Sequence, residues 1–258
     1  MLARERQNKI VEIVNKEGSV LVKELSELFK VTEDSIRKDL SALEKKGLLK
    51  KTYGGAIKNR VNTHEIYVSQ RKGKNVKEKQ LIAQKAFELI EEGDMIFLDI
   101  STSNIELIKL IIEANLKITV VSNMIDVMLS FVQPSDTNFV FVGGKMNRGR
   151  DGFIGSYTNK QIQEFNFDKA FMGAVGVDTD RDKVYTYATD DALTKKMIMD
   201  VSNKSYVMLE TRKLAREGNY KYANISDFAG IVMDSKPEEK ALKDLQQYNV
   251  ELLSLIHI

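Results

Sequence analysis

Three short stretches near the start of the chain carry apolar residues at helical spacing. The predicted helices span residues 4–17, 22–29 and 33–46, and each places one apolar stripe toward a common core. Thr32 precedes the third helix as a favourable N-cap, and Gly47 follows it as a stop signal. A helix, a tight turn and a capped helix are typical of the helix-turn-helix, whose last helix enters the major groove of DNA.

Residues 48–58 have a strand-like pattern with a turn at Gly54 and Gly55, which predicts a β-hairpin. Directly after the third helix, such a hairpin forms the wing of a winged helix-turn-helix. A small helical bundle that binds another protein has the same apolar stripes, and it is the alternative interpretation of this part of the chain.

From residue 75 onward, short apolar runs alternate with helical patterns. The predicted strands cover residues 95–99, 118–122, 139–142, 170–175, 206–210 and 231–234. The predicted helices cover residues 76–91, 103–114, 124–132, 158–164, 190–202 and 237–247. This alternation predicts an α/β domain with a mostly parallel sheet. The polar and basic residues 58–74 are interpreted as a linker between predicted domains at 1–57 and 75–258.

Polar residues gather where the predicted strands end, and parallel sheets bind ligands at that edge. Asp99 ends one strand, and Ser101-Thr102-Ser103 then opens a helix whose free N–H groups favour an anion. The same hydroxyls are also suited to nothing more than capping that helix. Other strand ends carry Ser122-Asn123, Gly143-Gly144-Lys145, and Glu210 before Lys213. A loop over residues 148–152 is expected at the surface, where it is able to close over an anion.

The amino-acid composition limits the class of protein and the kinds of chemical site that the chain can form. The 258 residues are 43% hydrophobic and 29% charged, which is ordinary for a soluble globular protein of one or two domains. The chain has 0 Cys and 2 His, so it has no residues for a disulfide and very few for a zinc site or for His-based catalysis. The apolar runs are shorter than the roughly 18 residues of a membrane span, and the N-terminus is polar, so we expect a cytoplasmic protein with no membrane partner.

Charge is distributed unevenly. The first 60 residues hold 14 Lys and Arg against 9 Asp and Glu, whereas the remainder holds 25 against 28. A basic end on a slightly acidic body favours a polyanionic partner for that end, although a solvated lysine face has the same signature. The candidate DNA-contacting residues lie on the third helix and the wing, and they are Thr32, Glu33, Ser35, Arg37, Lys38, Ser41, Lys50, Lys51, Tyr53, Gly54 and Gly55.

The first 57 residues resemble the winged helix-turn-helix of DeoR-type bacterial transcription regulators. The resemblance rests on Val31-Thr32-Glu33-Asp34-Ser35-Ile36-Arg37-Lys38-Asp39-Leu40, on Leu43-Glu44-Lys45-Lys46-Gly47-Leu48-Leu49 and on Tyr53-Gly54-Gly55-Ala56. Where the chain departs from the family pattern, as at Lys38, Lys51 and Tyr53, it mostly keeps charge or hydrogen-bonding capacity. The resemblance implies that double-stranded operator DNA is the partner and that the protein is a homodimer or homotetramer.

The rest of the chain is similar to the family's effector domain, which is related to ribose-5-phosphate isomerase-like folds. The matching segments are Asp99-Ile100-Ser101-Thr102-Ser103, Ser122-Asn123, Gly143-Gly144, Phe171 to Asp178, Asp191-Ala192 and Glu210-Thr211-Arg212-Lys213. The resemblance implies that Thr102, Ser103 and Lys213 hold the phosphate of a sugar phosphate. The candidate effector-binding residues are Asp99, Ser101, Thr102, Ser103, Asn123, Gly143, Gly144, Lys145, Asp191, Glu210, Arg212 and Lys213.

Within this set, Asp99, Asn123, Asp191 and Glu210 are the residues implied to contact sugar hydroxyls. Val175 stands where the family usually has a carboxylate that faces the sugar, and Arg212 replaces a serine and adds a cation. These departures bear on which sugar is bound.

The leading hypothesis is a transcriptional repressor of carbohydrate-metabolism genes whose DNA affinity is modulated by a phosphorylated sugar, with no cofactor, metal or catalytic residue. One alternative is a sugar-phosphate isomerase with an accessory domain, in which Asp99, Asp191 or Glu210 supplies the base. Val175 weakens that hypothesis because isomerase-like folds tend to place an acid there. A third possibility is a sugar sensor that recruits a protein partner through its basic end.

Overall fold

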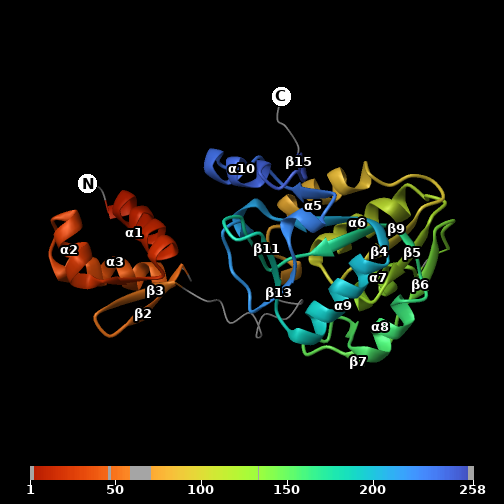
Figure 1. Ribbon diagram of the computed structural model, residues 1–258, viewed down its shortest axis with the longest axis horizontal. Coiled ribbons are helices and arrows are strands. Elements are labelled where there is room, and N and C mark those ends of the chain that lie inside the picture. Colours follow the sequence, from red (N-terminus) through yellow and green to blue (C-terminus); the bar gives the residue numbers. More distant parts are fainter. Residues whose placement is uncertain (1–2, 46–47, 59–70, 133, 255–258) are drawn as a thin grey trace. The chain divides into compact units, whose positions relative to one another are not determined.

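The computed structural model describes residues 3–45, 48–58, 71–132 and 134–254 of the chain. The chain divides into two compact units, residues 1–61 and 62–258, which are both drawn in Figure 1. Residues 59–70 of the predicted linker lie outside the described residues, as do Lys46 and Gly47 at the predicted end of the third helix. The domain boundaries predicted at residues 57 and 75 stay predictions.

The first unit is a winged helix-turn-helix, as predicted. Its elements are helices α1 (Ala3–Glu17), α2 (Val22–Phe29) and α3 (Glu33–Lys45) and strands β1 (Ser19–Leu21), β2 (Leu49–Thr52) and β3 (Gly55–Lys58). Ile10, Leu25, Ile36 and Leu40 are buried at 0 to 2% exposure, so the predicted stripes do meet in one core. Strand β1 was not predicted, and it pairs with β3 to make a sheet in the order β1-β3-β2.

A buried carboxylate and two glycines of the wing fix this unit. Asp39 of α3 is buried and accepts hydrogen bonds from Arg6 and Gln7 of α1, with an Arg6 Nε to Asp39 Oδ2 distance of 2.6 Å. The wing turns at Gly54, whose φ of +86° favours glycine. Gly55 passes so close to β1 that a Cβ on it would lie 2.0 Å from the Val20 carbonyl oxygen.

The second unit is built on a seven-stranded parallel sheet in the order β15-β14-β12-β9-β4-β5-β6. In chain order its strands are β4 (Met95–Leu98), β5 (Thr119–Ser122), β6 (Asn138–Phe141), β9 (Phe167–Gly173), β12 (Ser202–Leu209), β14 (Gly230–Met233) and β15 (Glu251–Ser254). The predicted α/β class and parallel sheet are confirmed.

Helices cover both faces of this sheet, because its central strands are apolar on both sides. On one face Ile96 and Leu98 pack with α5 (Val76–Phe87), α6 (Thr102–Glu113) and α7 (Ile125–Ser130). On the other face Phe97 packs in the cluster that includes residues of α8 (Ser156–Ile162), α9 (Thr189–Asp200) and α10 (Glu239–Gln246). The result is a three-layer domain (Figure 1).

The structure adds strands that the sequence pattern does not predict. They are β15, a hairpin of β7 (Lys145–Met146) and β8 (Phe153–Ile154), and an antiparallel sheet of β10 (Gly176–Asp178), β11 (Lys183–Thr186) and β13 (Tyr220–Ala223). Some predicted bounds were also wrong. The helix predicted over 76–91 ends at Phe87, and the strand predicted over 170–175 spans Phe167–Gly173. Two single-turn 3₁₀ helices, Thr211–Lys213 and Ile225–Asp227, complete the described elements.

Each helix in the described part of the chain is too short or too polar to cross a lipid bilayer.

Candidate functional site

The strand order of the large sheet creates a crevice beside β4. From β4 the chain proceeds to β5 and β6 on one side, whereas β9, β12, β14 and β15 lie on the other. Ligands of open α/β sheets bind at such a switch point, outside the carboxyl ends of the strands. Asn104 ties the two strand ends together, since its Nδ2 donates to the carbonyl oxygens of Asp99 and Phe171 at 2.7 and 2.9 Å.

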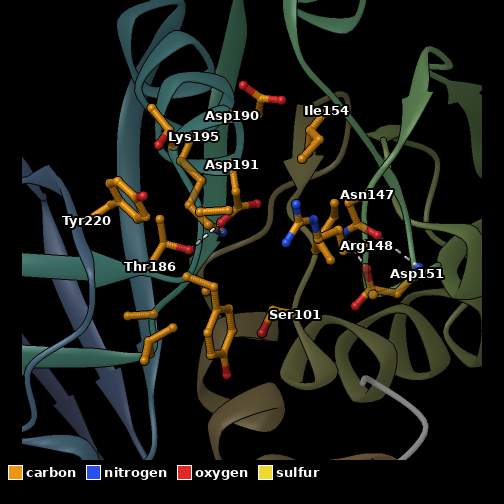
Figure 2. Close-up of a pocket in the computed structure, with 18 of the residues that line it drawn as sticks. Ser101, Asn147, Arg148, Asp151, Ile154, Thr186, Asp190, Asp191, Lys195 and Tyr220 are labelled. Atoms are coloured by element: carbon orange, nitrogen blue, oxygen red, sulfur yellow. Dashed lines mark hydrogen bonds and ion pairs between the residues drawn. The ribbon is translucent and has the colours of Figure 1, made fainter. Parts of the chain in front are cut away.

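A cavity of about 400 Å³ opens at this switch point. The segments after β4 and β9 both line it, through Ile100, Ser101 and Thr102 and through Gly173, Ala174 and Val175. Figure 2 shows Thr186, Asp191, Lys195 and Tyr220 on one side, Asn147, Arg148, Asp151 and Ile154 on the opposite side, and Ser101 between them at one end. Its volume is in the range of small-ligand sites.

The structure brings five of the twelve predicted effector-binding residues into the cavity wall. They are Ser101, Thr102, Lys145, Asp191 and Lys213. Ser101 is also the N-cap of α6, where its Oγ accepts a hydrogen bond from the Ser103 backbone N–H at 3.3 Å. The capping interpretation and the anion-site interpretation are therefore compatible at this helix end.

The other seven predicted residues lie outside the cavity lining. They are Asp99, Ser103, Asn123, Gly143, Gly144, Glu210 and Arg212. Asn123 Nδ2 donates to the Phe153 carbonyl at 2.8 Å, which ties the end of β5 to strand β8. The Gly143 carbonyl accepts from Thr158 and Gln161 of α8, each at 3.0 Å. Gly144 has a φ of +149°, and a Cβ there would meet Thr158 Oγ1 at 2.1 Å, so only glycine fits.

Asp99 belongs to a buried charged cluster whose other members, Asp191 and Lys195, line the cavity. Its carboxylate pairs with the Lys195 ammonium and accepts from the Gly173 backbone N–H at 2.8 Å. Asp191, one turn before Lys195 on α9, lies 4.0 Å from the same ammonium and accepts a hydrogen bond from Thr186 Oγ1. Burial alone would lower the pKa of Lys195, but the two carboxylates raise it above the ordinary value. Burial raises the pKa of Asp191.

A second cluster surrounds Glu210, which is 4% exposed at the end of β12. Burial opposes its charge, but Lys213 and the hydrogen bonds from Arg212 and Asn75 lower the pKa of this carboxyl to about 2. Burial lowers the pKa of Lys213 to about 8, against the Glu210 carboxylate, which raises it. Lys213 Nζ also donates to the Ala174 carbonyl at 3.1 Å, which holds it at the cavity wall.

The residues from Lys145 to Gly152 form the opposite wall of the cavity. Asp151 is 6% exposed and accepts a hydrogen bond from Asn147 Nδ2, which closes the tip of this segment. Lys145 pairs at 3.4 Å with the half-buried Asp190. Arg148 lines the cavity and has no acidic partner among the described residues. The segment expected as a surface loop that is able to close over an anion therefore supplies a cation, Arg148, to the cavity.

Sequence reasoning missed several lining residues, including Arg71, Thr186, Tyr187, Lys195 and Tyr220. A signal existed for one of them, because Asp191 and Lys195 stand four residues apart on one helix and are therefore neighbours on its surface. Arg71 was assigned to the linker. Thr186, Tyr187 and Tyr220 come from or adjoin strands of the small antiparallel sheet, which was not predicted.

Within the described residues, there is no group of three or more His, Cys, Asp and Glu placed to hold a metal ion.

The exposed face of α3 carries the predicted DNA-contacting residues of the first unit. Thr32 caps the helix as predicted, since its Oγ1 accepts from the Ser35 backbone N–H at 3.3 Å. Arg37 is exposed and pairs along the helix with Glu33 at 2.7 Å and Asp34 at 3.1 Å. An open hollow on this face is lined by Asp34, Arg37, Lys38, Ser41, Ala42 and Lys45.

The wing is fastened to this face. The Lys51 ammonium donates to Ser41 Oγ at 2.8 Å, and the Lys51 backbone N–H donates to Glu44 Oε1 at 2.8 Å. Lys50 is exposed on β2, and Tyr53 at the tip of the hairpin is fully exposed. The hairpin thus places two cations and an aromatic ring beside the exposed face of α3.

Family comparisons identify both units. The DeoR-like helix-turn-helix domain matches residues 6–61, and the DeoR C-terminal sensor domain matches residues 74–235. The chain belongs to the DeoR family of transcriptional regulators. It is therefore a DNA-binding regulator rather than an enzyme, and membership of the DeoR family decides against the isomerase alternative and the protein-recruiting alternative.

Relatives of this DeoR-family chain match over almost its whole length. The HTH-type transcriptional regulator YulB of Bacillus subtilis is 30% identical over 99% of this chain and 98% of the relative. The lactose phosphotransferase system repressor of Streptococcus mutans is 31% identical over 96% of this chain and 98% of the relative. Among solved structures, a ribose 5-phosphate isomerase A from Methanocaldococcus jannaschii is 20% identical over 53% of each chain, with a TM-score of 0.38.

Proposed function

We propose that this DeoR-family protein is a repressor of carbohydrate-metabolism genes and that a phosphorylated sugar in the cavity changes its affinity for operator DNA. The observation that carries the proposal is the cavity itself, which lies at the switch point and combines a helix N-terminus with several cations. The similarity to a lactose phosphotransferase system repressor supports a role in carbohydrate metabolism.

The phosphate is assigned to the end of the cavity formed by Ser101, Thr102 and Lys213. The N-terminus of α6 favours an anion there by about 0.3–1 kcal/mol through its dipole, before hydrogen bonds are counted. Lys213, held by Glu210 and the Ala174 carbonyl, supplies the opposing charge. The sugar then lies toward Asp191 and Thr186, whose oxygens are suited to hydroxyl groups.

The seven predicted residues outside the lining are assigned supporting roles. Asp99 holds Lys195, and Glu210 holds Lys213 and Arg212, so both carboxylates orient cations rather than contact sugar. Ser103, Asn123, Gly143 and Gly144 shape the strand ends through the contacts described above.

Operator binding is assigned to α3 and the wing. Ser35 and Arg37 are placed for base edges, Lys38 for a phosphate, and Lys50 and Lys51 for the DNA backbone. Thr32 and Glu33 order the first turn of α3, and Ser41 holds Lys51. Tyr53, Gly54 and Gly55 place the tip of the wing beside a groove.

The protein is further proposed to act in the cytoplasm as a homodimer or homotetramer. Two winged units related by symmetry read a palindromic or repeated site with half-sites one or more helical turns apart. Effector binding then alters the relative placement of the winged units and so changes operator affinity.

Two measurements on the full chain test the proposal. Selection from a pool of random duplexes is expected to recover a repeated or palindromic sequence, bound with a steep salt dependence of about −0.9 per neutralised phosphate on a log–log plot. Thermal-shift screening with hexose and pentose phosphates is expected to raise the melting temperature with at least one phosphorylated member and not with its free sugar. Recovery of no duplex, or stabilisation by no sugar phosphate, overturns the corresponding half of the proposal.

A further inference from the structure

Arg71 lines the cavity, although it belongs to no strand of the sheet and to no loop that follows one. It lies just before α5 and directly after residues 59–70. In the sequence, those residues connect the winged helix-turn-helix, called the winged unit, to the α/β domain, called the effector unit. Its guanidinium lies 5.4 Å from the centre of the Tyr187 ring, in a cation–π contact. Both Arg71 and Tyr187 line the cavity described above.

The charge of Arg71 is incompletely satisfied. Its Nη2 lies 3.6 Å from Asp151 Oδ2, which is longer than a direct hydrogen bond. Its Nε is buried and has no hydrogen-bond partner. Burying an N–H donor without a partner is unfavourable, so this group favours an oxyanion delivered into the cavity. A planar guanidinium suits the paired oxygens of a phosphate.

The backbone around Arg71 is anchored to the effector unit. Lys79 of α5 is 3% exposed, and its ammonium donates to the carbonyl oxygens of Arg71 and Lys74 at 2.7 and 2.6 Å. Lys72 forms an ion pair with Asp126 of α7. The point at which the chain enters the effector unit is thus fixed to the cavity wall, with the Arg71 side chain directed to the cavity.

We infer that Arg71 binds an anionic oxygen of the effector and thereby links occupancy of the cavity to the segment that leads to the winged unit. The inference rests on the proposed effector binding. Without effector, Arg71 is held loosely by Asp151 of the opposite wall. When effector is bound, one of its anionic oxygens accepts a hydrogen bond from Arg71 Nε and competes with Asp151 for the guanidinium. The partner of Arg71, which directly follows the connecting segment, therefore changes when the cavity is occupied.

Three variants of the full-length chain test this inference. R71A removes the guanidinium, R71K keeps the charge without the planar fork, and K74A is the matched control. Lys74 is an exposed cation three residues away that does not line the cavity, and its contact with Lys79 uses only its backbone. Because the carbonyl of residue 71 is also retained in R71A, the anchor to Lys79 persists in all three variants.

The probes are inorganic phosphate, glucose 6-phosphate, galactose 6-phosphate, fructose 6-phosphate and fructose 1-phosphate. Calorimetry measures the dissociation constant of each probe, and fluorescence anisotropy measures the affinity for the selected duplex with and without saturating probe. We expect K74A to match the parent and R71A to bind the responsive probe at least about tenfold more weakly. In R71A the ratio of duplex affinities with and without probe falls toward one, whereas K74A keeps the ratio of the parent.

The outcomes separate the two proposals. A responsive parent and an R71A variant that binds the probe and changes duplex affinity as the parent does overturn the role of Arg71 alone. A parent that binds none of the probes overturns the proposed effector class and this inference together. If R71A does not melt cooperatively, R71K decides instead: a several-fold loss of probe affinity supports the inference, and parent-like binding overturns it.

Discussion

Lys213 is the cavity cation whose charge is most sensitive to pH near neutrality. Burial lowers its pKa to about 8, so its ammonium is mostly present at pH 7 and mostly absent at pH 9. A phosphate ester is already mostly a dianion over this range, because its second pKa is about 6. The dissociation constant of the effector is therefore expected to rise about five- to tenfold from pH 7 to pH 9, measured by calorimetry.

The variant Lys213→Arg is the matched control for this titration. An arginine side chain stays charged over the whole range, so the pH dependence is expected to disappear in that variant. Equal effector affinity of the parent at pH 7 and pH 9 contradicts the placement of the Lys213 ammonium against the ligand.

Lys195 pairs with two carboxylates at the wall of the cavity. Its side chain is 4% exposed, and both Asp99 and Asp191 face its ammonium. Breaking a buried pair by removing one partner leaves charge uncompensated, so Lys195→Met is expected to lower the free energy of unfolding by about 3–5 kcal/mol. Urea denaturation measures this loss.

The neighbouring Lys196 provides a matched comparison, since it lies on the same helix and is exposed. Lys196→Met is expected to stay within about 0.5 kcal/mol of the parent. Equal stabilities of the two variants would show that the Asp99–Lys195–Asp191 cluster does not support the fold.

At the level of elements, α3 and the wing form the surface that we propose to contact DNA. Lys38 is exposed on α3 and lines the open hollow of that face. If it contacts a phosphate, Lys38→Ala is expected to weaken binding to all duplexes alike and to reduce the salt slope by about 1. Fluorescence anisotropy over a series of salt concentrations measures both quantities.

Lys204→Ala removes the same charge from an exposed position in the effector unit and serves as the control. It is expected to leave the salt slope unchanged. A Lys38→Ala slope equal to that of the parent places the phosphate contacts elsewhere on the winged unit.

The elements that were predicted from the sequence are those with a strong local signal. The stripe of Ile36, Leu40 and Leu43 and the Thr32 cap define α3 without reference to the rest of the chain. Likewise, the central strands of the large sheet are continuous apolar runs. By contrast, β10 is only 3 residues long, and β15 lies at the edge of the large sheet, where it pairs with β14.

The residues of the cavity show the same difference between those with a local sequence signal and those without one. Ser101, Thr102 and Lys213 were predicted because they follow strands whose ends meet at one edge of a parallel sheet. Arg71 was not predicted, because it comes from a stretch of sequence without periodicity. Its side chain is held at the cavity by contacts with Tyr187 and Asp151, which are distant in sequence. Tertiary packing, rather than local pattern, places that side chain.

At the level of the whole molecule, regulation of DNA binding by a sugar phosphate requires that the two units communicate. Coupling between an effector site and a DNA site is a free energy, and it acts equally in both directions. If a sugar phosphate changes duplex affinity by a given factor, the duplex changes sugar-phosphate affinity by the same factor. Calorimetric titration of the sugar phosphate into the free and the duplex-bound protein is expected to show this reciprocity.

The most direct test of regulation by a sugar phosphate measures the dissociation constant of the whole 258-residue chain for its selected duplex, in the presence of phosphorylated sugars and of the corresponding free sugars. We predict that at least one phosphorylated sugar changes this constant by about fivefold or more, and that its free sugar leaves it unchanged. A dissociation constant that is the same with every phosphorylated sugar, or that changes equally with the free sugar, would contradict regulation of DNA binding by a sugar phosphate.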